Sequence, residues 1–174
     1  MKKRFWTFFI MVAIATLAAT GQVPSKSKSR LITLGTRSGP FPTGARAQSS
    51  NALIVDGAVY LVDAGDGATR RLAEAAVPFR NIEAIFLTHL HDDHTSGLIP
   101  LMSVEWGNDR KDNVGIYGPP QTDLLVSAAI NFLSVNAGIR LSEGTRTIPL
   151  APVFTGQVVQ PGRVYRDRKS TRLN

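Results

Sequence analysis

The chain has 174 residues, which suits one domain, and its 43% hydrophobic content is enough for a globular core. Its net charge is +7, but Lys2, Lys3 and Arg4 carry three of these charges and the last eight residues carry a net two, which leaves only two for the body. The basic balance is therefore not evidence for a nucleic-acid surface. The absence of cysteine excludes disulfide bonds.

Residues 1–21 have the pattern of a secretory signal peptide. Three basic residues precede the charge-free apolar run 5–19, which is short for a membrane span of roughly 20 residues. Ala19-Thr20-Gly21 offers a cleavage site, so we expect a mature N-terminus at Gln22, or at Thr20 if cleavage follows Ala19. The rival interpretation is an uncleaved membrane anchor. We predict export to the periplasm or medium of a bacterium, with no stable membrane span after cleavage.

A polar linker over residues 22–29 leads into a region that predicts strands at 30–34, 51–55 and 58–63. A loop rich in glycine and proline separates the first two strands. Asp56-Gly57 separates the other two and is a strong signal for a two-residue hairpin.

Helices and strands alternate after this hairpin. The apolar spacing predicts helices over 69–76, 96–106 and 122–135 and strands over 84–88 and 114–117. The last helix should begin near a capping Thr122-Asp123. Residues 136–163 show no pattern that assigns them, and Val164-Tyr165 is typical of the beginning of a further strand. The alternation indicates an α/β layer architecture.

All three histidines of the chain lie within residues 89–94, which read His-Leu-His-Asp-Asp-His and follow the apolar run 84–87. Imidazole nitrogens and carboxylate oxygens are the ligands that Zn²⁺ prefers when thiolate is absent. The pattern therefore predicts a metal site where a strand ends at the edge of a sheet. A solvated polar loop is the alternative, and it leaves the clustering of the histidines unexplained.

The histidine motif resembles the metal-binding signature of the metallo-β-lactamase superfamily. Asp63-Ala64-Gly65-Asp66-Gly67 resembles that family's early Asp-x-Gly loop, and Leu34–Pro40 is similar to the glycine-rich opening of its arylsulfatase and ribonuclease Z-like branch. The resemblance covers residues 30 to about 120. It implies an αββα sandwich, of which residues 30–166 would form only the N-terminal part.

The resemblance also implies roles for the residues of the motif. His89 and His91 would bind one metal ion, and Asp93 and His94 would bind a second, both most simply Zn²⁺. Asp93 is accordingly taken as the catalytic residue. Asp92 occupies the variable position of the motif and is expected either to support a metal ligand from behind or to face solvent.

Three further features lie outside the motif. Asp63 is expected to orient a ligand histidine or the loop, and a turn-capping aspartate is the alternative. Asp66 stands where the ribonuclease Z-like branch often has a glutamate, and its expected role is structural. Arg37 and Arg46 lie in the glycine-rich loop, where they are either solvated or in contact with an anionic group of the substrate.

The function implied is that of an exported metal-dependent hydrolase that uses a metal-bridging hydroxide on small anionic esters of the aryl sulfate or phosphodiester type. Export and the small body charge predict a small-molecule ester substrate and no nucleic acid. The sequence leaves the oligomeric state open. The alternatives are a non-catalytic metal-binding or zinc-scavenging protein and a ribonuclease Z-like phosphodiesterase.

The C-terminal end departs from the rest of the chain. Residues 167–174, Asp-Arg-Lys-Ser-Thr-Arg-Leu-Asn, match one reading frame of a widely used DNA sequencing adapter. The family pattern also expects further metal ligands, and no histidine follows His94. We therefore interpret residues 167–174 as a non-native tail and the natural sequence as interrupted near Arg166.

Overall fold

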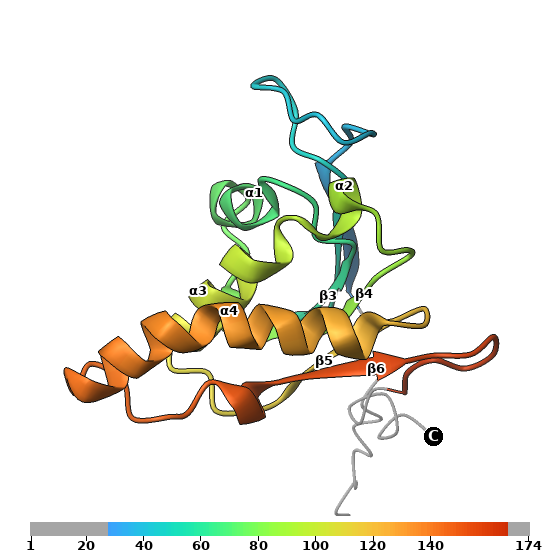
Figure 1. Cartoon of the computed structure of the whole chain (residues 1–174). Helices are drawn as coiled ribbons and strands as arrows, with labels where there is room; N and C mark the ends of the chain where they lie inside the picture. The colour runs from blue at the N-terminus through green and yellow to red at the C-terminus, as the bar shows by residue number, and fades with distance from the viewer. Residues whose placement is uncertain (1–27, 167–174) are drawn as a thin grey trace, which may run out of the picture.

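The computed structural model describes residues 28–166 (Figure 1). The predicted signal peptide, residues 22–27 of the predicted linker and the tail 167–174 lie outside these residues. The described residues form one six-stranded sheet whose spatial order follows the chain. Its strands are β1 (Ser29–Gly35), β2 (Ser50–Val55), β3 (Ala58–Val62), β4 (Ile82–Phe86), β5 (Val114–Gly118) and β6 (Phe154–Val158).

The first three strands form an antiparallel meander, and β3 to β6 run parallel. Asp56 and Gly57 have φ values of 48° and 88°, which is the left-handed backbone that a two-residue hairpin requires. The predicted hairpin is thus confirmed. Parallel strands need crossover connections, and helices provide them here.

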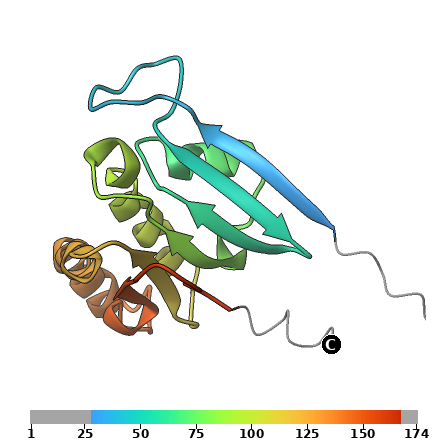
Figure 2. The same ribbon diagram turned by 90° about the vertical axis from the view of Figure 1, so that its right-hand side faces the viewer.

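The helices lie on one side of the sheet (Figures 1 and 2). They are α1 (Ala68–Glu74), α2 (Asp92–Thr95), α3 (Leu98–Gly107) and α4 (Thr122–Ser142), with short 3₁₀ turns η1 (Phe79–Asn81) and η2 (Ala151–Val153). The predicted α/β class is confirmed by this arrangement of one mixed sheet and one helical layer.

The main core lies between the helices and the sheet. Leu61 and Ile85 of the sheet and Leu101 of α3 are fully buried in it. Alternate strand residues point to the opposite face, where Tyr60 and Ala84 begin a smaller cluster that contains no helical residue. Phe86, Tyr117 and Tyr165 pack against this second cluster.

Several predicted boundaries differ from the observed ones. The predicted strand 84–88 is β4, which begins and ends two residues earlier, and the predicted helix 96–106 is α3 preceded by the separate turn α2. α4 continues seven residues past 135, because Ala137 is buried and holds the second half of the helix on the core. β6 forms within the unassigned segment, where Phe154 joins the core.

Two local predictions are wrong. Thr122 does not cap α4: its hydroxyl donates to the carbonyl oxygen of Pro119 at 2.7 Å, and Gln121 occupies the N-cap with a left-handed backbone. Val164 and Tyr165 do not begin a strand among the described residues. Instead the Tyr165 ring lies against those of Tyr60, Phe86 and Tyr117, so packing on aromatic side chains replaces strand pairing there.

By length and composition alone, α4 could cross a membrane, with a mean hydropathy of 1.5. One side of the helix, which includes Val126 and Leu133, is buried in the main core. Leu124 and Phe132 are about two-thirds exposed on the helix surface. The hydropathy of α4 therefore reflects a buried side together with exposed apolar side chains.

Candidate metal centre

The candidate centre forms where the neighbouring parallel strands β3 and β4 end. Asp63 follows β3 directly, and its backbone N–H donates to the carbonyl oxygen of Phe86 at the end of β4. Leu87 and Thr88 then lead into the histidine motif. Because the carboxyl ends of parallel strands meet at one edge of a sheet, residues 25 to 31 positions apart become neighbours there.

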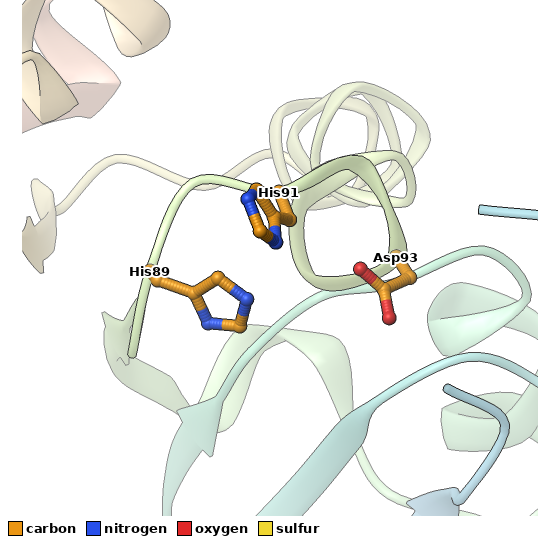
Figure 3. A group of neighbouring side chains, drawn as sticks. All are labelled: His89, His91 and Asp93. Carbon is orange, nitrogen blue, oxygen red and sulfur yellow. The ribbon is translucent and has the colours of Figure 1, made fainter. Parts of the chain in front are cut away.

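Three predicted ligands converge at this edge. Ligand atoms of His89, His91 and Asp93 all lie within 4.8 Å of one another (Figure 3). His91 precedes the one-turn helix α2, and this turn places Asp93 on the same side as the two histidines. Asp93 is buried, His89 is half-buried and His91 is exposed, so the group opens to solvent on one side.

His94 lies beside this group, and its two ring nitrogens face Asp63 and Asp93. Its Nδ1 is 2.7 Å from Oδ2 of Asp63, and its Nε2 is 3.6 Å from Oδ2 of Asp93. The tautomer that satisfies the Asp63 contact carries the proton on Nδ1. This leaves the lone pair of Nε2 facing Asp93, as a metal-ligating imidazole requires.

Asp63 is therefore placed as its predicted role requires, although that role stays a prediction. Its carboxylate accepts hydrogen bonds from the Thr88 backbone N–H at 2.8 Å and from the Thr88 hydroxyl at 2.9 Å. Asp63 has a left-handed backbone with φ of 62°, which aspartate tolerates better than most residues. The local backbone of Asp63 thus turns its carboxylate toward the motif.

Thr88 is a residue of the centre that the sequence analysis missed. Its hydroxyl donates to Asp63 and lies 3.1 Å from Nδ1 of His89, from which it can accept a hydrogen bond. In that arrangement both His89 and His94 keep Nε2 as the free ligand atom. The only sequence signal for Thr88 is its position directly before the first histidine.

The glycine-rich loop between β1 and β2 reaches the centre through one hydrogen bond. The backbone N–H of Gly39 donates to Oδ2 of Asp93 at 2.6 Å. This bond, with the nearby His94, lowers the pKa of Asp93 below its ordinary value. Asp93 is thus held in the ionised form that a metal ligand needs.

The other predicted positions lie at the margin of the centre. Asp92 is exposed, as expected, and its Oδ1 accepts the backbone N–H of Asp93. The backbone of Asp66 exchanges hydrogen bonds with Gln48, which agrees with a structural role. Arg37 contacts the carbonyl oxygen of Phe41 at 3.5 Å, and Arg46 is exposed.

The donor set fits a divalent transition metal. It offers imidazole nitrogens and one ionised carboxylate, without thiolate, and His94 has its second ring nitrogen satisfied by a carboxylate. Within the described residues four side chains could serve as ligands, His89, His91, Asp93 and His94. Four ligands are enough for one closed site, or for two sites that each take further ligands from elsewhere.

Curated relatives share this region. A protein named ribonuclease Z from Methanococcus aeolicus is 34% identical over 116 residues, which are 66% of this chain and 36% of that protein. Another of the same name from Mycobacterium sp. strain KMS is 33% identical over 129 residues, 73% of this chain and 45% of its own length. The chain thus spans less than half the length of these relatives.

Solved structures agree on the fold. The short form of human tRNase Z matches with a TM-score of 0.53 at 28% identity, covering 63% of this chain and 39% of that one. The metallo-β-lactamase fold protein YhfI from Bacillus subtilis matches with a TM-score of 0.55 at 21% identity, covering 80% and 48%. The second match supports the fold alone.

One prediction is overturned by these comparisons. Export and the small body charge had predicted a small-molecule ester and no nucleic acid. Relatives named ribonuclease Z and tRNase Z conflict with that prediction. The inference failed because net charge counts all surface residues, whereas substrate recognition depends on those near the site. These relatives support the ribonuclease Z part of the predicted branch, and none of them is named as an arylsulfatase.

The family assignment follows from the region that contains the motif. The family model described as "Anti-Pycsar protein Apyc1" matches residues 29–125, more than half of the chain and every residue of the candidate centre. The resemblance to metallo-β-lactamase proteins inferred from the histidine motif is confirmed by fold and by relatives. The chain belongs to the Apyc1 family, within the metallo-β-lactamase superfamily.

Proposed function

We propose that the full-length protein is a metal-dependent hydrolase that cleaves phosphodiester bonds of RNA. The convergence of His89, His91 and Asp93 within 4.8 Å, beside a His94 oriented by Asp63, is the observation that carries this proposal. The ribonuclease Z relatives that match this region support the substrate class.

We assign His89 and His91 to one Zn²⁺ and Asp93 and His94 to a second, with further ligands expected from outside the described residues. The 3.6 Å between His94 Nε2 and Asp93 Oδ2 is too long for a hydrogen bond and suits two ligands of one ion. The bound ions would supply Lewis-acid stabilisation of the charge that develops on the phosphate and would activate the attacking water.

The protein's own groups prepare this site before substrate arrives. The Asp63 carboxylate accepts a hydrogen bond from Nδ1 of His94. The Thr88 hydroxyl lies between the same carboxylate and His89 and links them by hydrogen bonds. Gly39 keeps Asp93 ionised through its N–H. Preorganisation of this kind keeps the ligands from reorganising when metal or substrate binds.

Metal analysis and RNA cleavage test the proposal together. Purified full-length protein should contain up to about two equivalents of zinc, as the two-metal arrangement implies. His91→Ala should lose one or both, and EDTA should abolish cleavage of a short RNA. Unchanged zinc in His91→Ala would refute the ligand assignment. A fully loaded protein that leaves RNA intact would refute the function and favour a non-catalytic metal-binding role.

We also propose that the protein is exported, on the evidence of the basic residues 2–4 and the apolar run 5–19. An exported enzyme would meet RNA outside the cytosol. N-terminal sequencing of material from the periplasm or medium should begin at Thr20 or Gln22. Intact Met1 in cytosolic protein would contradict this proposal.

A further inference from the structure

The loop between β1 and β2 extends beyond α2 at the end of the molecule that carries the metal centre (Figures 1 and 2). Its residues 40–46 are all exposed. Phe41 is 76% exposed, the most exposed large apolar side chain among the described residues. Exposing an aromatic ring to this degree costs hydrophobic free energy, which a binding partner that covers the ring would recover.

The base of this loop is nevertheless fixed. Gly39 is held from two sides, because its N–H donates to Asp93 at 2.6 Å and its carbonyl oxygen accepts Nε2 of Gln48 at 2.9 Å. Gln48 is only 2% exposed, and its Oε1 accepts hydrogen bonds from the Asp66 backbone and the Ser96 hydroxyl. The buried side-chain amide of Gln48 therefore fixes the loop to the segments that carry Asp66 and Ser96.

Phe41 is presented from this fixed base. It follows Gly39 by two residues, so its Cα can lie at most about 7 Å from that of Gly39. Pro40 and Pro42 flank it and restrict the backbone on both sides. The Cα of Phe41 thus lies within about 7 Å of that of Gly39, which contacts a candidate metal ligand, and it lies on a segment that loses little entropy when a ligand binds.

The loop also supplies positive charge. Arg37 and Arg46 lie on either side of Phe41, and in the described part of the chain neither forms an ion pair with a carboxylate. An exposed aromatic ring combined with arginines that can follow a phosphate backbone is the pattern by which proteins bind single-stranded nucleic acid.

We propose that Phe41 is a base-stacking residue for RNA, packing on the base of a nucleotide next to the phosphate held at the metal centre. The proposal rests on the proposed function and adds the position of a substrate contact. Stacking on an exposed ring tolerates any base, so Phe41 contributes affinity with little sequence preference.

Kinetics of full-length zinc-loaded protein on a short unstructured RNA test the proposal. Phe41→Ala should raise KM at least about fivefold and leave kcat nearly unchanged, in line with the stacking free energies measured for other proteins. Phe41→Trp should restore the wild-type KM. Phe132→Ala is the matched control, because Phe132 on α4 is 68% exposed and belongs to no part of the centre.

Abasic RNAs identify the contact as stacking. Removing one base at a time should weaken binding of the wild type at one position, and Phe41→Ala should show no further loss there, because the two changes remove the same interaction. An equal KM for Phe41→Ala and wild type would overturn the stacking role and leave the function standing. Loss of zinc in Phe41→Ala would also overturn it, because the side chain would then support the loop. A loaded wild type that neither binds nor cleaves RNA would refute both proposals.

Discussion

At the scale of single residues, Asp63 has the most connected side chain of the centre. It accepts hydrogen bonds from Thr88 and from His94. It thereby links His94 directly, and His89 through Thr88, to the end of β3. Asp63→Asn keeps the size of the side chain but removes its charge and one acceptor. We expect zinc affinity to fall about 10- to 100-fold.

Titration of zinc into metal-free protein measures this effect. Asp56→Asn is the matched control, because Asp56 also follows a strand with a left-handed backbone but lies in the β2–β3 hairpin. Similar losses of affinity in both variants would show that Asp63 acts through the general stability of the fold.

Glu105 is a buried acid outside the centre. It is 1% exposed in α3, its Oε2 lies 3.4 Å from the Arg110 guanidinium, and its Oε1 has no partner among the described groups. Burial raises its pKa from 4.5 to about 8, and Arg110 only partly opposes this. The folded state therefore binds a proton that the unfolded state releases between pH 4.5 and 8.

This difference predicts how stability depends on pH. The contribution of protonated Glu105 to the free energy of unfolding is complete below pH 4.5 and is lost as the pH rises toward 8. The free energy of unfolding falls over this range by on the order of a few kcal/mol. Glu105→Gln should remove this loss, so urea unfolding at pH 8 should show a more stable variant. Glu143→Gln, at the exposed end of α4, should follow the wild type. Parallel pH curves for Glu105→Gln and wild type would contradict the prediction.

At the scale of elements, two glycines in the helical layer should respond oppositely to alanine. Gly97 precedes α3, and a Cβ there would lie 2.1 Å from the backbone oxygen of Gly65. Gly97→Ala should therefore push α2 and α3 away from the loop after β3 and destabilise the fold by several kcal/mol. Gly138 lies inside α4, and a Cβ added there would meet nothing within 4 Å, so Gly138→Ala should stabilise by up to about 1 kcal/mol. Thermal unfolding of both variants compares them, and an equally tolerated Gly97→Ala would contradict the close approach.

The same elements show what the sequence could and could not reveal. The hairpin at Asp56-Gly57 and the motif at 89–94 were predictable, because the turn residues and the metal-ligand residues are each close together in the sequence. The contact between Gly39 and Asp93 spans 54 positions and was not predictable, since only the folded loop brings them together. Thr122 shows the same limit, because a capping residue type instead bonds back to Pro119.

At the scale of the whole molecule, the helices cover one face of the sheet. The register places Leu31, Leu53 and Tyr60 opposite one another across β1, β2 and β3 on the other face. Leu31 is 66% exposed and Leu53 is 38% exposed. β1 is also an edge strand of the described sheet. An apolar face that ends at an edge strand favours pairing between molecules.

We therefore expect the 174-residue chain to self-associate through this face. Leu31→Thr combined with Leu53→Thr keeps side chains suited to strands and should lower the apparent mass in sedimentation velocity at concentrations where the wild type associates. Leu124→Thr is the matched control: Leu124 is 65% exposed, but it lies on α4 rather than on the sheet. If Leu124→Thr abolishes self-association and the double variant does not, the molecules associate through α4. A wild type that remains monomeric at all concentrations would contradict the predicted self-association.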